Sequence, residues 1–224
     1  MKKIMMIAAM MVAAISANAQ NEVGQITLKP TVGLNIATMT KLDDSKVRPG
    51  FVAGVEAEYG ISENFGLQFG LLYSQQGAKS SGEEDFDLED FKELGLDFGV
   101  GILNIKGKDT YKLDYINIPI MAQYYPIKGL ALKAGIQPSF CVNKKYKIEG
   151  TATVSATGTE PFNEEYKLGD VVKSFQFAIP VGVSYEYENF VLDARYNIYL
   201  TKALKGFDSR HSVFSFTLGY KFAL

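Results

Sequence analysis

The end of the chain alternates strictly between large apolar residues and polar or small ones. From Phe214 to Leu224 every second residue is Phe, Leu or Tyr, and the residues between them are Ser, Thr, Gly, Lys and Ala. Successive side chains of a β-strand point to opposite faces, so this period of two predicts a strand with one apolar face. A strand of a soluble sandwich shows the same pattern, and the alternation alone does not decide which face meets water.

The same alternation recurs along the chain and predicts eight strands in all. The seven earlier strands are expected at residues 26–38, 49–59, 65–75, 111–125, 130–140, 172–187 and 190–200. Their lengths are close to the roughly 9–11 residues with which a tilted strand crosses a membrane. No segment after residue 20 is long and apolar enough for a helical span, which needs about 20 residues. If the chain crosses a membrane, a closed barrel is the remaining option.

The connections between the predicted strands are alternately short and long. The short ones fall at 60–64, 126–129 and 188–189, and the long ones at 39–48, 77–110, 142–171 and 201–210. An up-and-down transmembrane barrel has short periplasmic turns and longer outer loops. A Greek-key sandwich has no reason to place all its long connections on one side. The sequence therefore predicts an all-β fold: an eight-stranded, antiparallel, up-and-down transmembrane β-barrel.

The first residues have the pattern of a secretory leader. Lys2 and Lys3 precede the apolar segment 4–15, and the small-residue motif Ala17-Asn18-Ala19 follows. This order is typical of a cleaved signal peptide. We expect residues 1–19 to be the leader and residues 20–224 to form the barrel domain. A secreted barrel of this kind belongs in the outer membrane of a Gram-negative bacterium.

Polar and charged residues occupy the face that we assign to the barrel interior. They are Glu56, Glu58, Gln68, Gln123, Lys133, Glu186, Asp193, Arg195 and Lys221. An eight-stranded barrel is just wide enough for side chains to fill it. Charges in such a space must pair, because an isolated buried charge is costly. We expect an ionic network in the periplasmic half that leaves no wide aqueous channel. In a soluble protein the same residues would instead be solvated around an aromatic core.

The aromatic residues favour the membrane alternative, because they gather near the predicted strand ends. Transmembrane barrels carry aromatic girdles at both interfaces. The members of this set are Tyr59, Phe65, Tyr73, Tyr124, Tyr125, Tyr185, Tyr187, Phe190, Tyr220 and Phe222.

Two charged segments lie in the long connections. Residues 82–99 are strongly acidic, with apolar residues at near-helical spacing, so a short amphipathic helix or a solvated outer loop is expected. Such a loop could share divalent cations with lipopolysaccharide phosphates, although it lacks the calcium-loop pattern. Lys144, Lys145 and Lys147 could pair with this acidic loop or with lipid phosphates. A solvated strand extension is the alternative, and 150–158 suits a loop or a hairpin extension.

Catalytic, metal and nucleic-acid functions find little support. The formal net charge of −2 argues against nucleic acid. The single cysteine, Cys141, is expected to be a small apolar filler, and no metal or cofactor site is expected. His211 and Ser212 are the only pair that suggests catalysis. Adjacent strand residues point to opposite faces, so the two should not meet and an enzyme is not expected.

Several short motifs resemble one known family. The runs are Tyr115-Ile116-Asn117-Ile118-Pro119-Ile120, Tyr124-Tyr125-Pro126, Lys133-Ala134-Gly135, the stretch 70–77, Asp193-Ala194-Arg195-Tyr196-Asn197 and Leu218-Gly219-Tyr220-Lys221-Phe222. Together they are similar to the PorT-type outer-membrane β-barrel family of Bacteroidota, also called porin-family proteins, over nearly the whole mature chain. The resemblance implies the barrel fold and the outer membrane. The namesake members take part in secretion and gliding, but no motif here assigns that role.

The sequence therefore predicts a structural or binding function. The barrel would act as a membrane-embedded scaffold whose outer loops meet a surface partner or lipopolysaccharide. A narrow channel for small solutes is one alternative, and it would need interior charges that line a continuous path. A component of a secretion system is the other, and it would copurify with partners.

Overall fold

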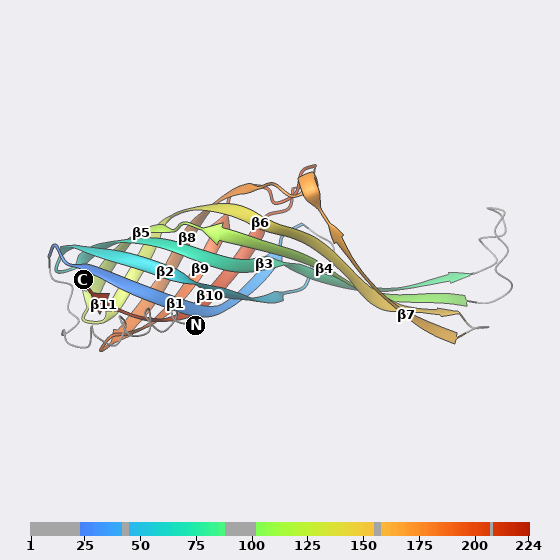
Figure 1. The fold of residues 1–224 in the computed structure, drawn as a ribbon, viewed down its shortest axis with the longest axis horizontal. Helices are drawn as coiled ribbons and strands as arrows, with labels where there is room; N and C mark the ends of the chain where they lie inside the picture. Colours follow the sequence, from blue (N-terminus) through green and yellow to red (C-terminus); the bar gives the residue numbers. More distant parts are fainter. Residues whose placement is uncertain (1–22, 42–44, 88–101, 155–157, 207) are drawn as a thin grey trace, which may run out of the picture.

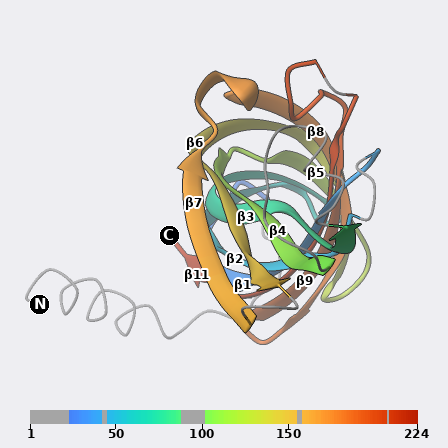
Figure 2. The same cartoon turned by 90° about the vertical axis from the view of Figure 1, so that its right-hand side faces the viewer.

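Eight strand positions form a closed ring of antiparallel neighbours (Figures 1 and 2). The computed structural model describes residues 23–41, 45–87, 102–154, 158–206 and 208–224. The expected leader at 1–19 lies outside the described residues. The ring consists of β1 (Ile26–Met39), β2 (Arg48–Ser62), β3 (Phe65–Asp87), β4 (Ile102–Asn117) with β5 (Ile120–Ile127), β6 (Leu130–Val154), β8 (Phe175–Tyr187), β9 (Phe190–Tyr199) and β10 (His211–Tyr220).

The ring closes where β10 pairs with β1, with Phe216 opposite Leu34. The short strand β11 (Phe222–Ala223) continues this pairing along β1. The predicted tight turns are present at one end of the barrel: β2 leads to β3, β5 to β6, and β8 to β9 through two-residue connections. The last of these uses Glu188, whose φ of 54° is left-handed. The prediction of an eight-stranded antiparallel up-and-down barrel is confirmed.

The prediction of one continuous fourth strand over 111–125 was wrong. It is broken between β4 and β5 at Ile118 and Pro119. Proline has no N–H to donate to the sheet ladder. The break stays hydrogen-bonded to β3 and β6 on its two sides. Gly70 N on β3 donates to Pro119 O at 2.8 Å, and Ile118 N donates to Pro138 O on β6 at 2.9 Å. The break therefore leaves the barrel wall closed.

The long connections 77–110 and 142–171 differ most from expectation. We predicted loops, with a strand extension at Lys144–Lys147 and a hairpin extension at 150–158 as alternatives. In the structure β3, β4 and β6 continue far beyond the barrel as strands, and β7 (Gly158–Lys167) pairs with β6, which confirms the two alternatives. Figure 1 shows this four-stranded sheet projecting from the barrel. We call it the arm; it comprises 79–87, 102–112, 142–154 and 158–167. The thirteen residues of β6 in the arm span about 40 Å at roughly 3.3 Å per residue.

The predicted amphipathic helix was also wrong over its described part. Residues 83–87 are the end of β3, and the rest of 82–99 from residue 88 lies outside the described residues. The only helical element between the arm and β8 is a single 3-10 turn, η2 (Gly169–Val171), within the described residues. Nowhere in the described part of the chain is there a helix long and apolar enough to cross a bilayer.

The barrel exterior is apolar and the interior polar, the reverse of a soluble protein. Large apolar side chains on alternate positions of every strand are exposed, among them Leu34, Leu71, Leu132, Leu192 and Phe216. Lys29, Gln68, Lys133 and Asp193 face inward and are buried. Exposed aromatic side chains gather next to the tight turns: Tyr59, Phe65, Tyr124, Tyr185, Tyr187 and Phe190. This distribution fits a lipid-facing belt about 25 Å tall with an aromatic border.

Candidate functional site

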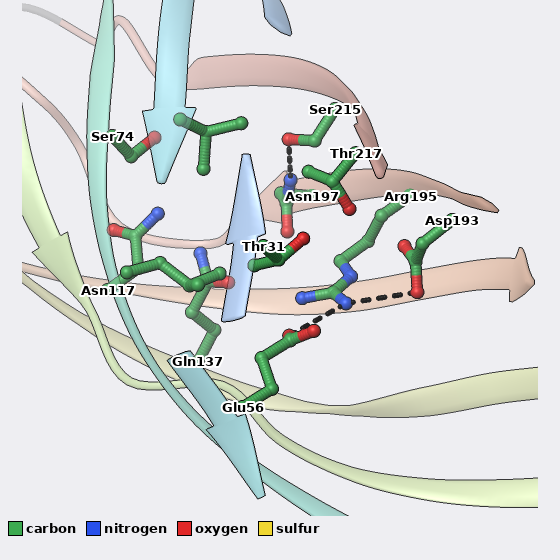
Figure 3. Close-up of a pocket in the computed structure, with 12 residues that line it drawn as sticks. Thr31, Glu56, Ser74, Asn117, Gln137, Asp193, Arg195, Asn197, Ser215 and Thr217 are labelled. Atoms are coloured by element: carbon green, nitrogen blue, oxygen red, sulfur yellow. Dashed lines mark hydrogen bonds and ion pairs between the residues drawn. The ribbon is translucent and has the colours of Figure 1, made fainter. Parts of the chain in front are cut away.

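The barrel interior near its middle holds a compact set of ion pairs. Arg195 on β9 donates to Glu56 Oε1 at 3.0 Å and lies 3.2 Å from Asp193 Oδ2. Figure 3 shows the guanidinium placed between the two carboxylates. Lys29 on β1 lies 2.8 Å from Glu56 Oε2, and Lys133 on β6 lies 2.7 Å from Asp193 Oδ2. Side chains from β1, β2, β6 and β9 therefore meet across the barrel.

A second set of ion pairs lies nearer the tight turns. Lys221, just after β10, contacts Glu186 on β8 at 2.6 Å and Glu58 on β2 at 3.3 Å. The Tyr125 hydroxyl donates a hydrogen bond to Glu58. It also lies 3.3 Å from Gln123 Oε1. This set fills the periplasmic end with side chains from β2, β5 and β8 and with Lys221, which lies between β10 and β11.

We call the eight charged residues of both sets the charge network. Its cations are Lys29, Lys133, Arg195 and Lys221, and its anions are Glu56, Glu58, Glu186 and Asp193. Four positive and four negative charges make the network neutral. Gln68 completes it by accepting a hydrogen bond from Lys133 at 3.1 Å. Neutrality matters because a buried charge without a partner costs several kcal/mol.

Sequence reasoning missed Lys29, although the signal was present. Lys29 falls on the inward positions of β1, between the outward residues Leu28 and Pro30. Its side chain needs the space left by Gly219 on β10. A Cβ at Gly219 would lie 2.7 Å from Lys29 Cγ and 2.9 Å from Cδ. The glycine thus makes room for the fourth cation of the network.

Above the charge network, amides and hydroxyls fill the barrel. Asn35 donates to Ser74 Oγ at 2.9 Å and accepts from Ser215 at 2.7 Å. Gln76 donates at 2.8 Å to the Tyr199 hydroxyl, which Gln137 reaches at 3.3 Å. These side chains come from β1, β3, β6, β9 and β10, so their hydrogen bonds span the whole width of the barrel.

The space left between these layers is very small. A cavity of about 10 Å³ lies beside Glu56, Arg195 and Asn197 (Figure 3). That volume holds about one water molecule. A continuous path for hydrated solutes would require a much larger opening at this level.

The outer mouth of the barrel is covered by apolar residues. The outer cap, as we call this cluster, consists of Met39, Ala78, Leu113, Tyr115, Val172, Ala203 and Leu204. Val172 and Leu204 come from the connections after β7 and β9 and pair as an isolated bridge. Because these connections fold back over the strand ends, both ends of the described barrel are filled.

His211 and Ser212 point to opposite faces, as the strand geometry requires. His211 is 2 % exposed and faces inward, with Nε2 3.2 Å from the Tyr115 hydroxyl. Ser212 Oγ lies 2.8 Å from the hydroxyl of Tyr196 instead. The Tyr115 hydroxyl also accepts from Gln176 at 2.8 Å. His211 is therefore part of the interior packing below the outer cap, with no nucleophile in the contacts described for it.

The basic residues on the outer part of β6 form ion pairs within the arm. Lys145 lies 2.6 Å from Glu165 Oε1, and Lys112 lies 2.9 Å from the other oxygen of Glu165. The hydrogen bonds from Lys145, which has the larger effect, and from Lys112 lower the pKa of Glu165 from 4.5 to about 2. Lys147 contacts Glu149 at 2.5 Å. These lysines lie on the outer part of β6, as the alternative of a solvated strand extension predicts. Their pairing with lipid phosphates or with the acidic segment stays a prediction.

Lys144 serves a different purpose, because it donates to Val172 O at 2.8 Å and to Ser174 Oγ at 2.9 Å. It thereby ties β6 to the segment that carries the outer cap. Cys141 is a half-buried free thiol packed against that cap. Among the residues that the structure describes, no group of three or more His, Cys, Asp or Glu side chains is placed to hold a metal ion.

Comparison with known proteins decides the family. The family model described as the outer membrane protein beta-barrel domain matches residues 18–205. The chain belongs to this outer-membrane β-barrel family. Members of such a family reside in the outer membrane of Gram-negative bacteria. A comparison with curated proteins found no match for this outer-membrane barrel.

Solved structures of small outer-membrane barrels are similar to this one in fold. The attachment invasion locus protein Ail of Yersinia pestis is 16 % identical, with 90 % of this chain and 100 % of that chain covered and a TM-score of 0.42. Neisserial surface protein A is 16 % identical over 88 % and 97 % of the two chains, with a TM-score of 0.42. OprG of Pseudomonas aeruginosa is 9 % identical over 91 % and 97 %, also at 0.42.

Proposed function

We propose that this protein is a closed outer-membrane scaffold that anchors a rigid binding arm on the cell surface. One contrast carries the proposal. The barrel interior is filled from the charge network to the outer cap. In the same molecule, β3, β4 and β6 continue beyond it and β7 joins them, with β6 extending about 40 Å. A structure whose function was conduction would need the opposite arrangement, an open lumen.

The arm is built to be stable in water without a barrel around it. Its two central strands are basic: 102–112 and 142–154 each contain three lysines and one acidic residue. Its two edge strands are acidic, because 79–87 has four acidic residues and one lysine, and 158–167 has three and one. Opposite charges favour the pairing of each edge strand with the central strand beside it. Like charges on both free edges oppose edge-to-edge pairing of two arms.

One face of the arm is available for contact with a partner. Tyr111 and Tyr146 pack there as a tilted pair with ring centroids 4.8 Å apart. Phe162 covers Gly150, where a Cβ would lie 2.6 Å from the ring. Tyr166 continues this row and is 53 % exposed. Tyr111, Tyr146 and Phe162 are half-buried and Tyr166 is exposed, and tyrosine is enriched among the residues that dominate binding interfaces. We infer that this aromatic face meets a surface partner or lipopolysaccharide.

The finer placement of the protein is part of the same proposal. We infer that residues 1–19 are a cleaved signal peptide, supported by the basic, apolar and small-residue order of that segment. We also place the chain in the PorT-type family of Bacteroidota, on the motifs around Pro119, Lys133 and Tyr220. The channel alternative is disfavoured by the filled interior.

Surface proteolysis of intact cells tests the proposal. Trypsin added outside should cleave at the arm lysines, such as Lys106 and Lys108, which are exposed. It should leave a barrel fragment that still shifts on unheated gels, because Lys29 and Lys133 are buried. A K106Q/K108Q variant should lose cleavage at these two positions and serves as the control. Cleavage only after the outer membrane is opened would overturn the orientation and with it the proposal.

A further inference from the structure

Three basic side chains converge on one carboxylate at the outer rim of the barrel. Lys41 forms an ion pair with Asp208, Lys202 Nζ lies 3.5 Å from Asp208 Oδ1, and Arg210 Nη2 lies 3.8 Å from the same oxygen. We call these four residues the rim cluster. Three cations around one anion leave a net charge of +2. The three basic side chains are 67 %, 48 % and 48 % exposed, so an external anion can reach them.

The carboxylate of the rim cluster stays ionised. The hydrogen bond from Lys41 holds the pKa of Asp208 below its usual value, and the charges of Lys202, Lys41 and Arg210 act in the same direction. Asp208 therefore holds the three basic side chains together, and its single negative charge does not neutralise their three positive charges.

The rim cluster lies directly above the lipid-facing belt. The outward residues Ile36, Phe214 and Ile198 of β1, β10 and β9 are exposed apolar side chains. The ladder between β1 and β10 continues above them, because Thr40 N donates to Arg210 O at 2.9 Å. Arg210 directly precedes β10, Lys202 follows the end of β9 at Tyr199, and both are exposed at the outer end of this wall. This is the level at which the headgroups of the outer leaflet lie.

The same wall of the barrel carries an apolar groove below the rim cluster. The groove has a volume of about 470 Å³ and is shared by β8, β9, β10 and β1. Ala194 stands in it opposite Val183 on β8 and Phe216 on β10. Its short side chain leaves a depression between larger neighbours. The apolar side chains around it are Val32, Leu34, Val183, Tyr185, Leu192, Phe216 and Leu218.

The spacing between groove and rim cluster matches half a bilayer. Phe216 and Arg210 are six residues apart on one strand, which is about 20 Å at roughly 3.3 Å per residue. With the usual strand tilt of about 40°, the difference in height is about 15 Å. The hydrocarbon core is about 30 Å thick, so the groove lies near its midplane. An acyl chain of the outer leaflet ends there when its headgroup is at the rim.

We propose that the rim cluster and the groove together bind one lipid of the outer leaflet that carries phosphate on its headgroup. The phosphate is held by Lys41, Lys202 and Arg210, and one acyl chain lies over Ala194. This goes beyond the proposed function, because neither element belongs to the arm. The pairing of the net-positive rim cluster with an apolar groove on one wall selects an amphiphile over a free anion.

The test uses the full-length protein refolded in an uncharged maltoside detergent. Native mass spectrometry measures retention of lipid A with both phosphates and of the same lipid with both phosphates removed. The wild type should retain the phosphorylated lipid at least about tenfold better, given roughly fivefold for each basic residue near a charged surface. The K41Q/K202Q/R210Q variant should lose this preference. The A194L variant, which fills the groove, should retain both lipids less well.

Matched controls separate this site from general charge effects. In the K112Q/K145Q variant, two lysines that also share one carboxylate, Glu165, are neutralised on the arm. It should behave as the wild type. Equal loss in this variant, or no preference in the wild type, would overturn the proposal. So would full displacement of the lipid by millimolar inorganic phosphate, because the site would then be one for free anions. Heat-dependent gel shifts confirm that each variant is folded.

Discussion

Lys133 on β6 and Asp193 on β9 form a 2.7 Å ion pair although β8 runs between their strands. The residue of β8 at that level is Gly182, which is opposite both Lys133 and Arg195 in register. Because Gly182 has no side chain, the lysine can cross to the next strand. The charge network thus depends on a glycine in the barrel wall as well as on its charged residues.

Removal of one anion from the charge network should destabilise the barrel strongly. The D193N variant leaves Lys133 and Arg195 buried with one fewer carboxylate. Breaking a buried pair in this way costs about 3–5 kcal/mol. Urea unfolding in lipid vesicles measures the difference. The D170N variant, which changes an exposed aspartate beside η2, is the control and should unfold as the wild type. Equal midpoints for D193N and the wild type would show that the ion pair contributes nothing.

The missing side chain of Gly182 should be essential for packing. A Cβ at that position would lie 2.7 Å from Ala194 O and 3.2 Å from Arg195 Cα, both backbone atoms that cannot move freely. The G182A variant should therefore lose about 1–3 kcal/mol of unfolding free energy. The control is G107A on the arm, where a Cβ meets nothing within 4 Å. If both variants unfold alike, the close approach at Gly182 is not a constraint.

His211 should contribute to folding and leave lipid chemistry unaffected. The H211A variant removes the 3.2 Å contact with the Tyr115 hydroxyl and opens space beneath the outer cap. The expected cost is about 1–3 kcal/mol of stability. Mass spectrometry of lipid A from cells with the wild type or the variant should give identical profiles. An altered profile in the variant would point to an enzymatic function that this account does not contain.

The arm should loosen at low pH. The pKa of Glu165 is lowered from 4.5 to about 2 by hydrogen bonds from Lys145 and Lys112. A depressed carboxyl pKa stabilises the folded state above the unfolded pKa, and this stability is lost as pH falls from about 4.5 towards 2. Hydrogen exchange along β7 should therefore accelerate between pH 5 and pH 2.5, beyond the intrinsic change in rate. In the E165Q variant, β7 exchange should be faster at pH 5 and lack this extra step.

The barrel could be predicted from the sequence because its wall repeats one simple rule. Outward residues such as Leu192 and inward ones such as Asp193 alternate along most of the wall, and the turns at one end are short enough to fix their strands as neighbours. The inward charges were visible for the same reason, and the same rule would have found Lys29, which alternates with Leu28 and Pro30. Pairing partners were not visible, since Lys133 reaches over β8 to Asp193 and no local pattern encodes such a crossing.

The arm could not be predicted by the same rule. At 80–83 and 104–109 no side chain is buried on either face, so apolar and polar residues do not alternate as they do in the barrel. Acidic residues such as Glu83 with interspersed apolar ones mimic a helix, and only the pairing with Lys106 on the neighbouring strand reveals the sheet. The rim cluster was hidden in another way, because Lys41 and Asp208 are 167 residues apart and meet only when β10 closes on β1.

The central claim is that the interior is closed, and single-channel recording in a planar bilayer tests it most directly. The full-length protein, shown to be folded by its heat-dependent gel shift and inserted by protease protection, should give no conductance steps. The D193A/R195A variant, which empties the middle of the charge network, serves as the positive comparison and should give small, flickering steps. Stable and uniform steps from the wild type would contradict the account and would make Glu56, Lys133 and Arg195 the lining of a pore.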